Sequence, residues 1–456
     1  MARKEHFVQN EISLGGRNGR ARLVEYPGNQ PIFDRYGGCG SHPLFKLLQT
    51  PPGGFGFVPT PSNPPTVPLN AIKWRAVQFA FKCWKKGASL KCVYKFLKTR
   101  DLESQRSIGQ AGASLVFFPS VPFHLNQSPW MIEVEDSTSL FYPFLNNGST
   151  KHTGTISRQR FFPIYDELVH SPQCKGIITH MKSTADSLPT IFNSPSLSKK
   201  VFHIPLGINL PDWTEVMKAK AKKEGEILIL FANSWHQDPA NFYLRGGLDV
   251  LETFSLIKRQ CPAARLVIRS ALPRDLAKKH PEHFKMTKEP GMEILDHFLK
   301  ADEWERLKMS ADYFILPSAR IHVVSILEAM AYGMTLITSN GWGIEEYAKD
   351  NHNAVVVPGR DRVAWMDGDT GILREDYSLM FQTDRRIVEG MAKAVVYLNS
   401  DSSFKDKLTL QARSDVENIY SVHNWNQKLK AVLENIVLGE TAADEEQIPA
   451  SGGQRA

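Results

Sequence analysis

The sequence predicts an α/β protein whose second half forms a doubly wound parallel sheet, and three observations carry this prediction. Short apolar segments alternate with segments of helical spacing from residue 226 to residue 357, as a parallel sheet with crossover helices requires. A chain of 456 residues is too long for one hydrophobic core and suits two domains of ordinary size. A hydrophobic fraction of 42% is that of a globular protein with substantial cores.

The alternation is clearest between residues 313 and 358. Strand, helix, strand and helix follow one another there, at residues 313–316, 324–332, 335–338 and 344–348. Pro317 and Ser318 end the first apolar run, and Gly333 ends the first helix. Gly341 and Gly343 supply the backbone freedom of a tight turn. Such a unit directs helix N-termini and glycine turns to the carboxyl edge of the sheet, where backbone N–H groups can hold a phosphate.

The remaining elements are predicted from the same patterns. First-domain strands are expected at 114–118, 130–134, 176–180 and 201–205, and further second-domain strands at 226–231, 265–269 and 354–357. Helices at 385–398 and 403–437 are expected to lie across both domains. Seven prolines between residues 51 and 68 indicate an extended surface loop, and a lysine-rich segment near 212–224 indicates the linker. The small and polar end of the chain, 439–456, is predicted to be disordered.

One set of motifs resembles a known family. Residues 317–318, 327–331, 333, 341, 343 and 345 resemble, in order and spacing, the signature of the retaining glycosyltransferases of family 4, also called glycosyl transferases group 1. The segment KVFHIPLGIN at 200–209 resembles the end of that family's first domain. Residues 226–231 with 245–254 resemble the first strand and helix of its nucleotide domain, and Trp425 matches an aromatic segment that crosses back. The resemblance covers roughly residues 110–437 and is weakest before residue 115.

The resemblance implies the GT-B fold, in which two Rossmann-like domains face each other across a cleft. Residues 1–215 would bind the acceptor, 216–400 the nucleotide sugar, and 401–438 would form helices that return to the first domain. It also implies a glycosyltransferase (hexosyltransferase) that moves a hexose-type sugar from a nucleotide-diphosphate sugar to an acceptor hydroxyl, with retention. The alternatives are a catalytically silent sugar-nucleotide binder of the same fold, or a basic membrane or nucleic-acid adaptor.

Candidate donor-site residues follow from the matched positions. Glu328 is the acid placed to hydrogen-bond a ribose diol, although in isolation it could be an ordinary helix residue. Arg245 falls where the family has a lysine against the donor diphosphate, and backbone N–H groups near the glycines would assist it. The predicted donor-binding set is Glu328, Gly341, Gly343, Ser318, His322 and Thr338. A second basic residue is absent from its usual place; His236 or Arg269 could substitute, but each is predicted to be a surface or loop residue.

Two departures from the family fall on its chemistry. The family has a Glu eight positions before the second Glu, and here that position is Arg320; it has a His at the end of a first-domain strand, and here 130–134 is followed by Glu135 and Asp136. One interpretation is a relocated ion pair across the cleft, with Arg320 also able to fork onto the carboxylate of an acidic sugar. A second is that the donor chemistry has been lost. A third is a shifted register in which His322 contacts the sugar. The candidate catalytic set is Arg320, Glu135, Asp136 and Arg245.

No metal or cofactor is predicted. Asp367, Gly368 and Asp369 form an Asp-x-Asp, which in a different transferase fold would hold a divalent cation. Asp-Gly is among the commonest turn dipeptides, so we interpret this segment as a turn. Residues 36–42, YGGCGSH, could form a glycine-rich loop near the acceptor and the diphosphate, but a glycine cluster without a clear strand before it is a weak signal.

A basic segment spans residues 71–100. It holds nine Lys and Arg residues and no acid, within a chain of net charge +7. Ile72, Ala76, Val77, Ala80, Phe81 and Trp84 are predicted to share one helical face. Three interpretations remain open: a surface helix that leaves its lysines in water, docking on an anionic membrane, or nucleic-acid binding, the last being disfavoured.

The cellular setting is predicted from what the sequence contains. The five cysteines are scattered, without close metal-ligand pairs, which fits a reducing compartment. No run of eighteen apolar residues is present, and the first residues lack a hydrophobic signal core. The predicted location is cytoplasmic, with a peripheral position on a membrane as the alternative.

Overall fold

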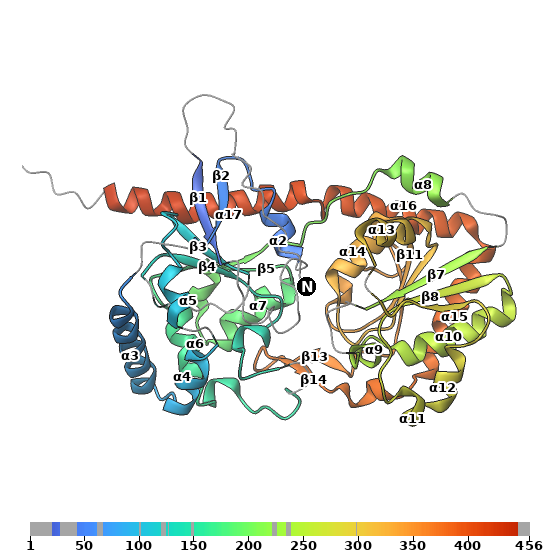
Figure 1. Ribbon diagram of the computed structural model, residues 1–456, viewed down its shortest axis with the longest axis horizontal. Coiled ribbons are helices and arrows are strands. Elements are labelled where there is room, and N and C mark those ends of the chain that lie inside the picture. Colours follow the sequence, from blue (N-terminus) through green and yellow to red (C-terminus); the bar gives the residue numbers. More distant parts are fainter. Residues whose placement is uncertain are drawn as a thin grey trace, which may run out of the picture.

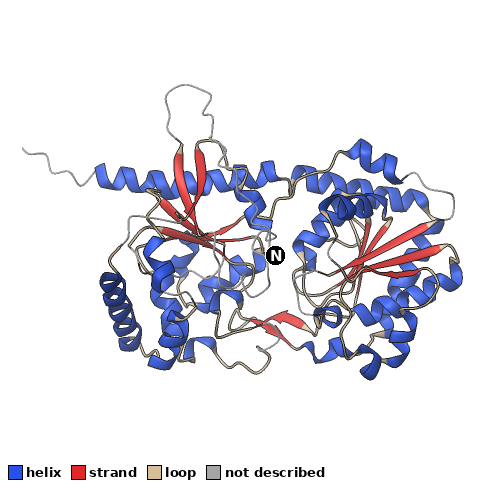
Figure 2. Ribbon diagram, in the orientation of Figure 1, coloured by secondary structure: helices blue, strands red, loops and turns tan. Residues whose placement is uncertain are grey.

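The protein is built around two six-stranded parallel sheets (Figure 1). The computed structural model describes residues 21–27, 43–61, 67–99, 102–119, 125, 127–146, 150–220, 226–233, 239–297 and 299–445. Helices surround each sheet (Figure 2), as crossover connections between parallel strands require. The prediction of two doubly wound α/β domains is therefore confirmed.

The first sheet has the strand order β2-β1-β3-β4-β5-β6. Its strands are β1 (Arg22–Tyr26), β2 (Phe55–Pro59), β3 (Leu115–Phe118), β4 (Trp130–Glu133), β5 (Cys174–Thr179) and β6 (Val201–His203). The last four confirm predicted strands. The loop predicted at 51–68 is wrong in part, because β2 lies within it; an edge strand tolerates Pro59 at its end. Glu25, buried in β1 and bonded to the N–H groups of Gly109 and Ala111, interrupts the apolar pattern that would have indicated β1.

Helices of the first domain carry the basic segment on its outer side. The helices are α2 (Pro43–Leu48), α3 (Leu69–Lys85), α4 (Leu90–Leu97), α5 (Leu102–Ser107), α6 (Phe162–Val169) and α7 (Lys182–Ile191). Short 3-10 turns lie at Ser139–Phe141, Ile156–Arg158 and Pro195–Lys200. Gly87, with φ of 97°, separates α3 from α4, because only glycine adopts this conformation without strain.

The second sheet has the order β12-β11-β10-β7-β8-β9. Its strands are β7 (Ile227–Ala232), β8 (Ala264–Arg269), β9 (Met292–Ile294), β10 (Tyr313–Leu316), β11 (Thr335–Ser339) and β12 (Val355–Val357). Its helices are α9 (Asn241–Leu244), α10 (Gly247–Gln260), α11 (Leu276–Lys279), α12 (Pro281–Met286), α13 (Ala301–Ser310), α14 (Val323–Ala331) and α15 (Arg385–Ser400), with 3-10 turns at Ile344–Glu346 and Tyr377–Phe381. The predicted helix at 344–348 is thus a short 3-10 turn. The strand β9 was not predicted.

The segment predicted as a linker contains a helix, α8 (Trp213–Lys220). Val216 is fully buried, and the helix packs against α13 of the second domain. Only one of the eight residues of α8 is buried, so the sequence shows almost no apolar periodicity from which this helix could be predicted. The predicted boundary between residues 215 and 216 therefore falls inside α8.

An antiparallel hairpin connects the two domains. It consists of β13 (Ala364–Met366) and β14 (Leu373–Glu375) and lies between the domains in Figure 1. Ile372, at its turn, is fully buried in the hydrophobic cluster of the first domain. The Leu373 N–H donates to Ser137 Oγ at 2.9 Å, so a segment that follows the second sheet completes the first domain's core.

The last two helices join both domains on one side. α16 (Ser402–Asn418) packs against α14, and α17 (Val422–Glu445) extends along the first domain (Figure 1). The two replace the single helix expected at 403–437. The prediction of a disordered tail from 439 is wrong for residues 439–445, which are the last turns of α17; their Ala and Glu residues favour a helix.

Candidate functional site

The candidate site lies where the two domains face each other. The loop after β10 carries Ser318, Arg320 and His322, and the loop after β4 carries Glu135 and Asp136. Both loops leave the carboxyl ends of parallel strands, which is where α/β sheets bind their ligands. The sequence-predicted catalytic residues of the two domains are thus brought together.

Arg320 forms an ion pair across the domain boundary. Its Nη2 lies 2.6 Å from Asp136 Oδ2 and 3.6 Å from Glu135 Oε1. Its Nη1 lies 3.1 Å from Glu375 Oε1 on the hairpin, and its guanidinium lies 5.5 Å from the ring centroid of Trp342. The predicted pairing of Arg320 with Glu135 or Asp136 is confirmed, and Glu375 is a third partner that the sequence did not reveal.

Burial decides the electrostatics of this network. The side chains of Arg320 and Asp136 are 8% and 3% exposed, whereas that of Glu135 is 45% exposed. Burial alone would raise the pKa of Asp136, but Arg320 and the hydrogen bond from Thr138 outweigh it and hold that pKa below its usual range. Both terminal nitrogens of the Arg320 guanidinium are already paired, one with Asp136 and the other with Glu375. The protein's own carboxylates therefore take the place predicted for the carboxylate of an acidic sugar.

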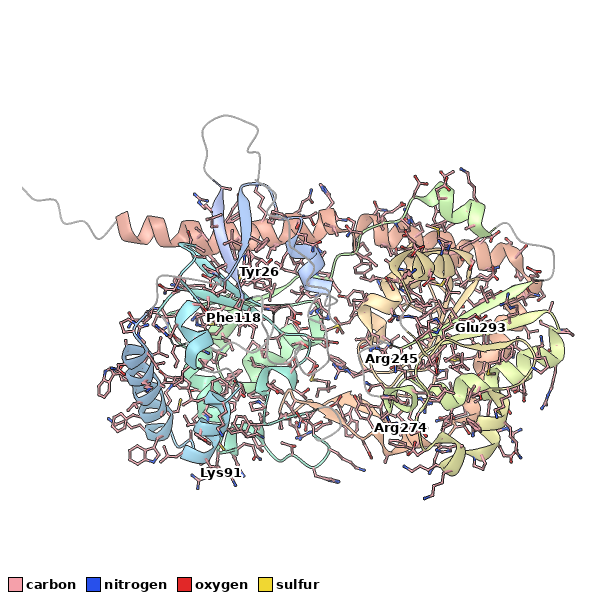
Figure 3. The ribbon with its side chains drawn as sticks, in the orientation of Figure 1. Tyr26, Lys91, Phe118, Arg245, Arg274 and Glu293 are labelled. Carbon is pink, nitrogen blue, oxygen red and sulfur yellow. The ribbon has the colours of Figure 1, made fainter. Side chains whose placement is uncertain are left out.

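Two arginines lie together at the carboxyl end of the second sheet. Arg245 is 3% exposed and donates to Ala232 O at the end of β7; it lies on the side of the second domain that faces the first (Figure 3). Arg269 ends β8 and donates to Asn233 O at 3.2 Å. Burial is the main cause that lowers the pKa of Arg245 to about 9; Glu135 opposes the shift, and Arg269 adds to it.

Arg269 does not fit its prediction as a surface or loop residue. It is the last residue of β8, and its guanidinium lies 4.6 Å from the ring centroid of Trp304. Burial lowers its pKa, an effect that Glu328 partly opposes. The sequence signal was present, since Arg269 ends a predicted strand. Its proximity to Arg245, however, depends on the neighbouring order of β7 and β8.

His322 lies close to both Arg245 and Arg320. Burial, and then these two cations, lower the pKa of His322 well below its usual range. The imidazole is therefore neutral at physiological pH, and a neutral imidazole both donates and accepts a hydrogen bond. Whether it contacts a sugar stays a prediction.

Glu328 is paired within its own domain. It lies on α14, and its Oε1 accepts from Lys308 Nζ at 2.7 Å. Lys308 is buried and also lies 4.1 Å from the ring centroid of Tyr332. The carboxylate remains 23% exposed, so one oxygen can still accept from a diol. Its predicted contact with ribose stays a prediction.

The other predicted donor-site residues show structural roles. The Thr338 hydroxyl donates to Leu316 O at 2.9 Å. A Cβ on Gly341 would lie 2.4 Å from the carbonyl oxygen of Ser318, and one on Gly343 would lie 2.5 Å from Met181 Cε of the first domain. Both glycines are therefore required for close packing. Their predicted donor contacts, and those of Ser318, stay predictions.

Sequence reasoning missed a buried pair on the first-domain side. Glu133 Oε1 lies 2.7 Å from His180 Nδ1; Glu133 is the last residue of β4, and His180 directly follows β5. Burial raises the pKa of Glu133, whereas the bond to Glu133 raises that of His180 against the effect of burial. A histidine at the end of a predicted apolar strand was the available signal.

A second missed contact joins the two domains. The carboxylate of Glu346, from the second domain, accepts from the N–H groups of Lys182 and Ser183 at the start of α7. Tyr347 donates its hydroxyl to His180 O at 2.6 Å. A carboxylate at a helix N-terminus is stabilised by the helix dipole, so Glu346 holds the two domains together at this end.

The Asp-x-Asp segment forms the hairpin turn, as predicted. Asp367 Oδ1 accepts from the N–H groups of Asp369 and Thr370, and Oδ2 accepts from Arg374 Nε at 2.9 Å. Among the described residues, no group of three His, Cys, Asp or Glu side chains is arranged to hold a metal ion. His236 and the glycine-rich segment 36–42 lie outside the described residues.

Comparisons with known proteins agree with this architecture. Residues 240–374 match the model of the family described as Glycosyl transferases group 1. A glycosyltransferase from Rickettsia africae superposes with a TM-score of 0.52 at 12% identity, covering 92% of this chain and 99% of that one. HepE of Anabaena, solved with UDP and glucose, gives 0.51 at 10% identity, covering 91% and 100%.

A third similar structure covers less of each chain. The pneumococcal O-GlcNAc transferase GtfA, solved with UDP and GlcNAc, gives a TM-score of 0.50 at 12% identity and covers 71% of this chain and 57% of that one. At identities this low, the superpositions show that the proteins share a fold. The protein therefore contains a region, residues 240–374, that matches the glycosyl transferases group 1 family, and it shares the two-domain GT-B fold of solved glycosyltransferases.

Proposed function

We propose that the protein is a glycosyltransferase that moves a hexose-type sugar from a nucleotide-diphosphate sugar to an acceptor hydroxyl, with retention. The observation that carries this proposal is the pair of arginines at the carboxyl end of the second sheet. Arg245 lies within the region that matches the family, and Arg269 ends the strand beside it. Burial lowers the pKa of both guanidinium groups, and the charge of Arg269 is a further unfavourable influence on Arg245.

A diphosphate would relieve that cost. Bringing two cations together in a buried position is unfavourable until an anion is placed between them. Arginine binds phosphate through two parallel hydrogen bonds, and positive charge stabilises the diphosphate as it leaves. The two arginines would supply the charge that a metal ion supplies elsewhere, so we propose a reaction without a metal or another cofactor.

The neighbouring side chains have proposed roles around this anion site. Glu328 would accept hydrogen bonds from the ribose diol, and neutral His322 would bind the sugar or a phosphate oxygen. Glu135, nearly half-exposed and electrostatically coupled to Arg245 and Arg320, would contact the acceptor hydroxyl or the transferred sugar. Arg320 and Asp136, already paired, would position Glu135 across the cleft.

The donor is best sought among UDP-sugars. Two structures that share the fold were solved with UDP and a sugar, which supports a uridine nucleotide. A thermal-shift panel of UDP, GDP, dTDP, CMP and ADP with their common sugars should show stabilisation by one nucleotide, because a ligand that binds only the native state raises its stability by mass action. Slow hydrolysis of the corresponding sugar nucleotide, unchanged by EDTA, should follow.

Variants of one strand test the role of the arginines. Replacing Arg269 with Met should weaken donor binding about 10- to 100-fold, the range expected for a lost hydrogen bond to a charged group. Arg265, on the same strand but 61% exposed and paired with Glu293, provides the matched control, and its replacement should leave binding unchanged. Equal binding by both variants would contradict the anion site.

The alternative is a silent nucleotide-sugar binder. It is favoured by one observation, the engagement of Arg320 by Asp136 and Glu375 in place of a substrate. Binding without hydrolysis, and without transfer to any of a panel of glycan and glycolipid acceptors, would support it. We also propose a cytoplasmic location. None of the described helices is long and apolar enough to cross a membrane.

A further inference from the structure

The helix α3 has two apolar faces. Ile72, Ala76 and Cys83 are buried against the first domain. On the opposite side of the same helix, the large apolar side chains at positions 74, 77, 81 and 84 are exposed. The predicted single face of residues 72–84 is therefore wrong, because Val77, Phe81 and Trp84 lie on the outer side. A helix of a monomeric soluble domain normally leaves its outer face polar.

The outer apolar surface continues onto α4. Its members are more than half exposed: Trp74 62%, Val77 56%, Phe81 51%, Trp84 52%, Leu90 62% and Tyr94 59%. We call these six residues the α3–α4 surface. They lie at the end of the first domain that is remote from the second (Figure 1). Large apolar side chains gathered in this way mark an interaction site.

Lysines accompany the aromatic side chains. Lys73, Lys85, Lys91 and Lys98 are exposed, and none of them takes part in an ion pair within the described part of the chain. Lys85 Nζ lies 4.5 Å from the ring centroid of Phe81, and Lys98 Nζ lies 4.6 Å from that of Tyr94. Lys91 projects outward at the tip of the first domain (Figure 3).

The acidic side chains that pair with lysines of α3 in the described part of the chain lie at the inner border of this surface. Lys86 Nζ lies 2.9 Å from Glu167 on α6 and 3.1 Å from Asp166, and Lys82 lies 3.7 Å from Glu167. No acid occurs between residues 67 and 99. The outward charge is therefore positive, and its complement is an anionic partner.

The chemistry favours a membrane over a protein or a nucleic acid. Trp and Tyr partition to the boundary between lipid headgroups and acyl chains, and lysine side chains extend from that depth to the headgroup phosphates. Protein interfaces, in contrast, are depleted in lysine and enriched in arginine. Single-strand nucleic-acid sites are charged grooves, whereas this surface is the outer side of a helix.

We propose that the α3–α4 surface docks the protein on an anionic membrane, with α3 lying in the plane of the interface. The aromatic side chains insert among the headgroups, and the lysines bind the anionic lipids. α3 has 17 residues and thus presents a length of about 25 Å. The proposal concerns where the protein binds and stands independently of its transfer reaction.

Vesicle sedimentation with the full-length protein tests this proposal. Wild-type protein should pellet with vesicles that contain phosphatidylglycerol and remain in solution with phosphatidylcholine alone, and added salt should weaken the binding. The variant W74S/F81S/W84S should lose at least about ten-fold in affinity. The variant K85S/K91S/K98S should lose about 100-fold, since each lysine near an anionic surface contributes about five-fold.

Matched controls lie on the second domain. Leu410 and Tyr397 are 57% and 52% exposed, so the variant Y397S/L410S removes a similar kind of apolar exposure without touching the surface, and its binding should equal wild type. All variants should keep the wild-type unfolding temperature, because every replaced side chain is exposed.

Four results would overturn the proposal. These are binding to neutral and anionic vesicles alike, no vesicle binding at all, unchanged binding by both surface variants, or tighter binding to duplex or single-stranded nucleic acid that the lysine variant abolishes. Self-association that the aromatic variant abolishes, together with absent vesicle binding, would instead identify a second copy of the chain as the occupant.

Discussion

Replacing Arg320 with Met should destabilise the protein by roughly 3–5 kcal/mol, the loss that follows when one partner of a buried ion pair is removed. The guanidinium lies 2.6 Å from Asp136 and 3.1 Å from Glu375. At 2.6 Å and an effective dielectric constant of about 20, the Coulomb attraction is about 6 kcal/mol. Burial of the charges offsets part of it, but in the variant both carboxylates stay buried without their cation.

The pH dependence of this loss has a definite sign. In the native protein the folded-state pKa of Asp136 is lower than its unfolded value, so its contribution to stability is complete above about pH 4 and disappears as the pH falls through the folded-state pKa. In the variant, burial without Arg320 raises the pKa of Asp136. The folded variant then takes up a proton more readily than the unfolded chain. The loss of unfolding free energy should therefore be smaller at pH 5 than at pH 8.

Urea unfolding followed by tryptophan fluorescence at pH 8 and pH 5 measures both quantities. The triple variant R320M/D136N/E375Q should recover most of the lost free energy, because it removes the unpaired charges together with the cation. A loss below about 1 kcal/mol, the range of exposed pairs, would refute the reasoning. So would an equal loss at both pH values, or a triple variant no more stable than the single one.

A buried ion pair within one domain provides the matched control for the effect of Arg320 on the arrangement of the two domains. Arg360 and Asp249 form a buried ion pair inside the second domain. Replacing Arg360 with Met should also lower stability, but it should leave the radius of gyration in small-angle scattering unchanged. Replacing Arg320 should increase that radius, because its partners belong to the other domain and to the hairpin.

Three further predictions concern the packing that holds the site together. Gly341→Ala should cost roughly 1–3 kcal/mol or more, since its Cβ would lie 2.4 Å from a backbone oxygen, whereas Gly368→Ala, with nothing within 4 Å, should lie within about 0.5 kcal/mol of wild type in urea unfolding. Ile372→Ala should cost roughly 2–5 kcal/mol, because this fully buried hairpin residue fills the first domain's core; a smaller loss would mean that the hairpin is not docked. Glu346→Gln should weaken the cap on α7 by about 1 kcal/mol and make the loops between the two domains more accessible to limited proteolysis. The control substitution of the neighbouring residue, Glu345→Gln, should leave the digestion pattern unchanged.

The second domain was predicted well because its signals are local. The strands at 313–316 and 335–339 and the helix between them each have a continuous apolar pattern and a glycine or proline at the end. The first domain was predicted less completely. Glu25 in the middle of β1 breaks its apolar pattern, and the prolines around β2 indicated a loop.

The site was predicted only in part, because local sequence signals identify its loops but not every contact between them. Matching spacing indicated that Arg320 and the acids after β4 would face each other, and the structure confirms that ion pair. Glu375 and Arg269 were not assigned to the site. Glu375 reaches Arg320 from a hairpin 55 residues further along the chain, and Arg269 reaches Arg245 because β7 and β8 are neighbours in the sheet.

The sequence by itself determined the α/β class, the strand–helix units of the second domain, the basic aromatic helix and the residues that carry charge at the loops after β4 and β10. These properties depend on the order of neighbouring residues. Only the tertiary structure decided which of those charges meet, that Ile372 completes the first domain's core, and that α3 exposes Trp74, Phe81 and Trp84. The reason is physical: periodicity specifies that an apolar face exists, whereas packing decides which face is buried and which partner lies opposite each charge.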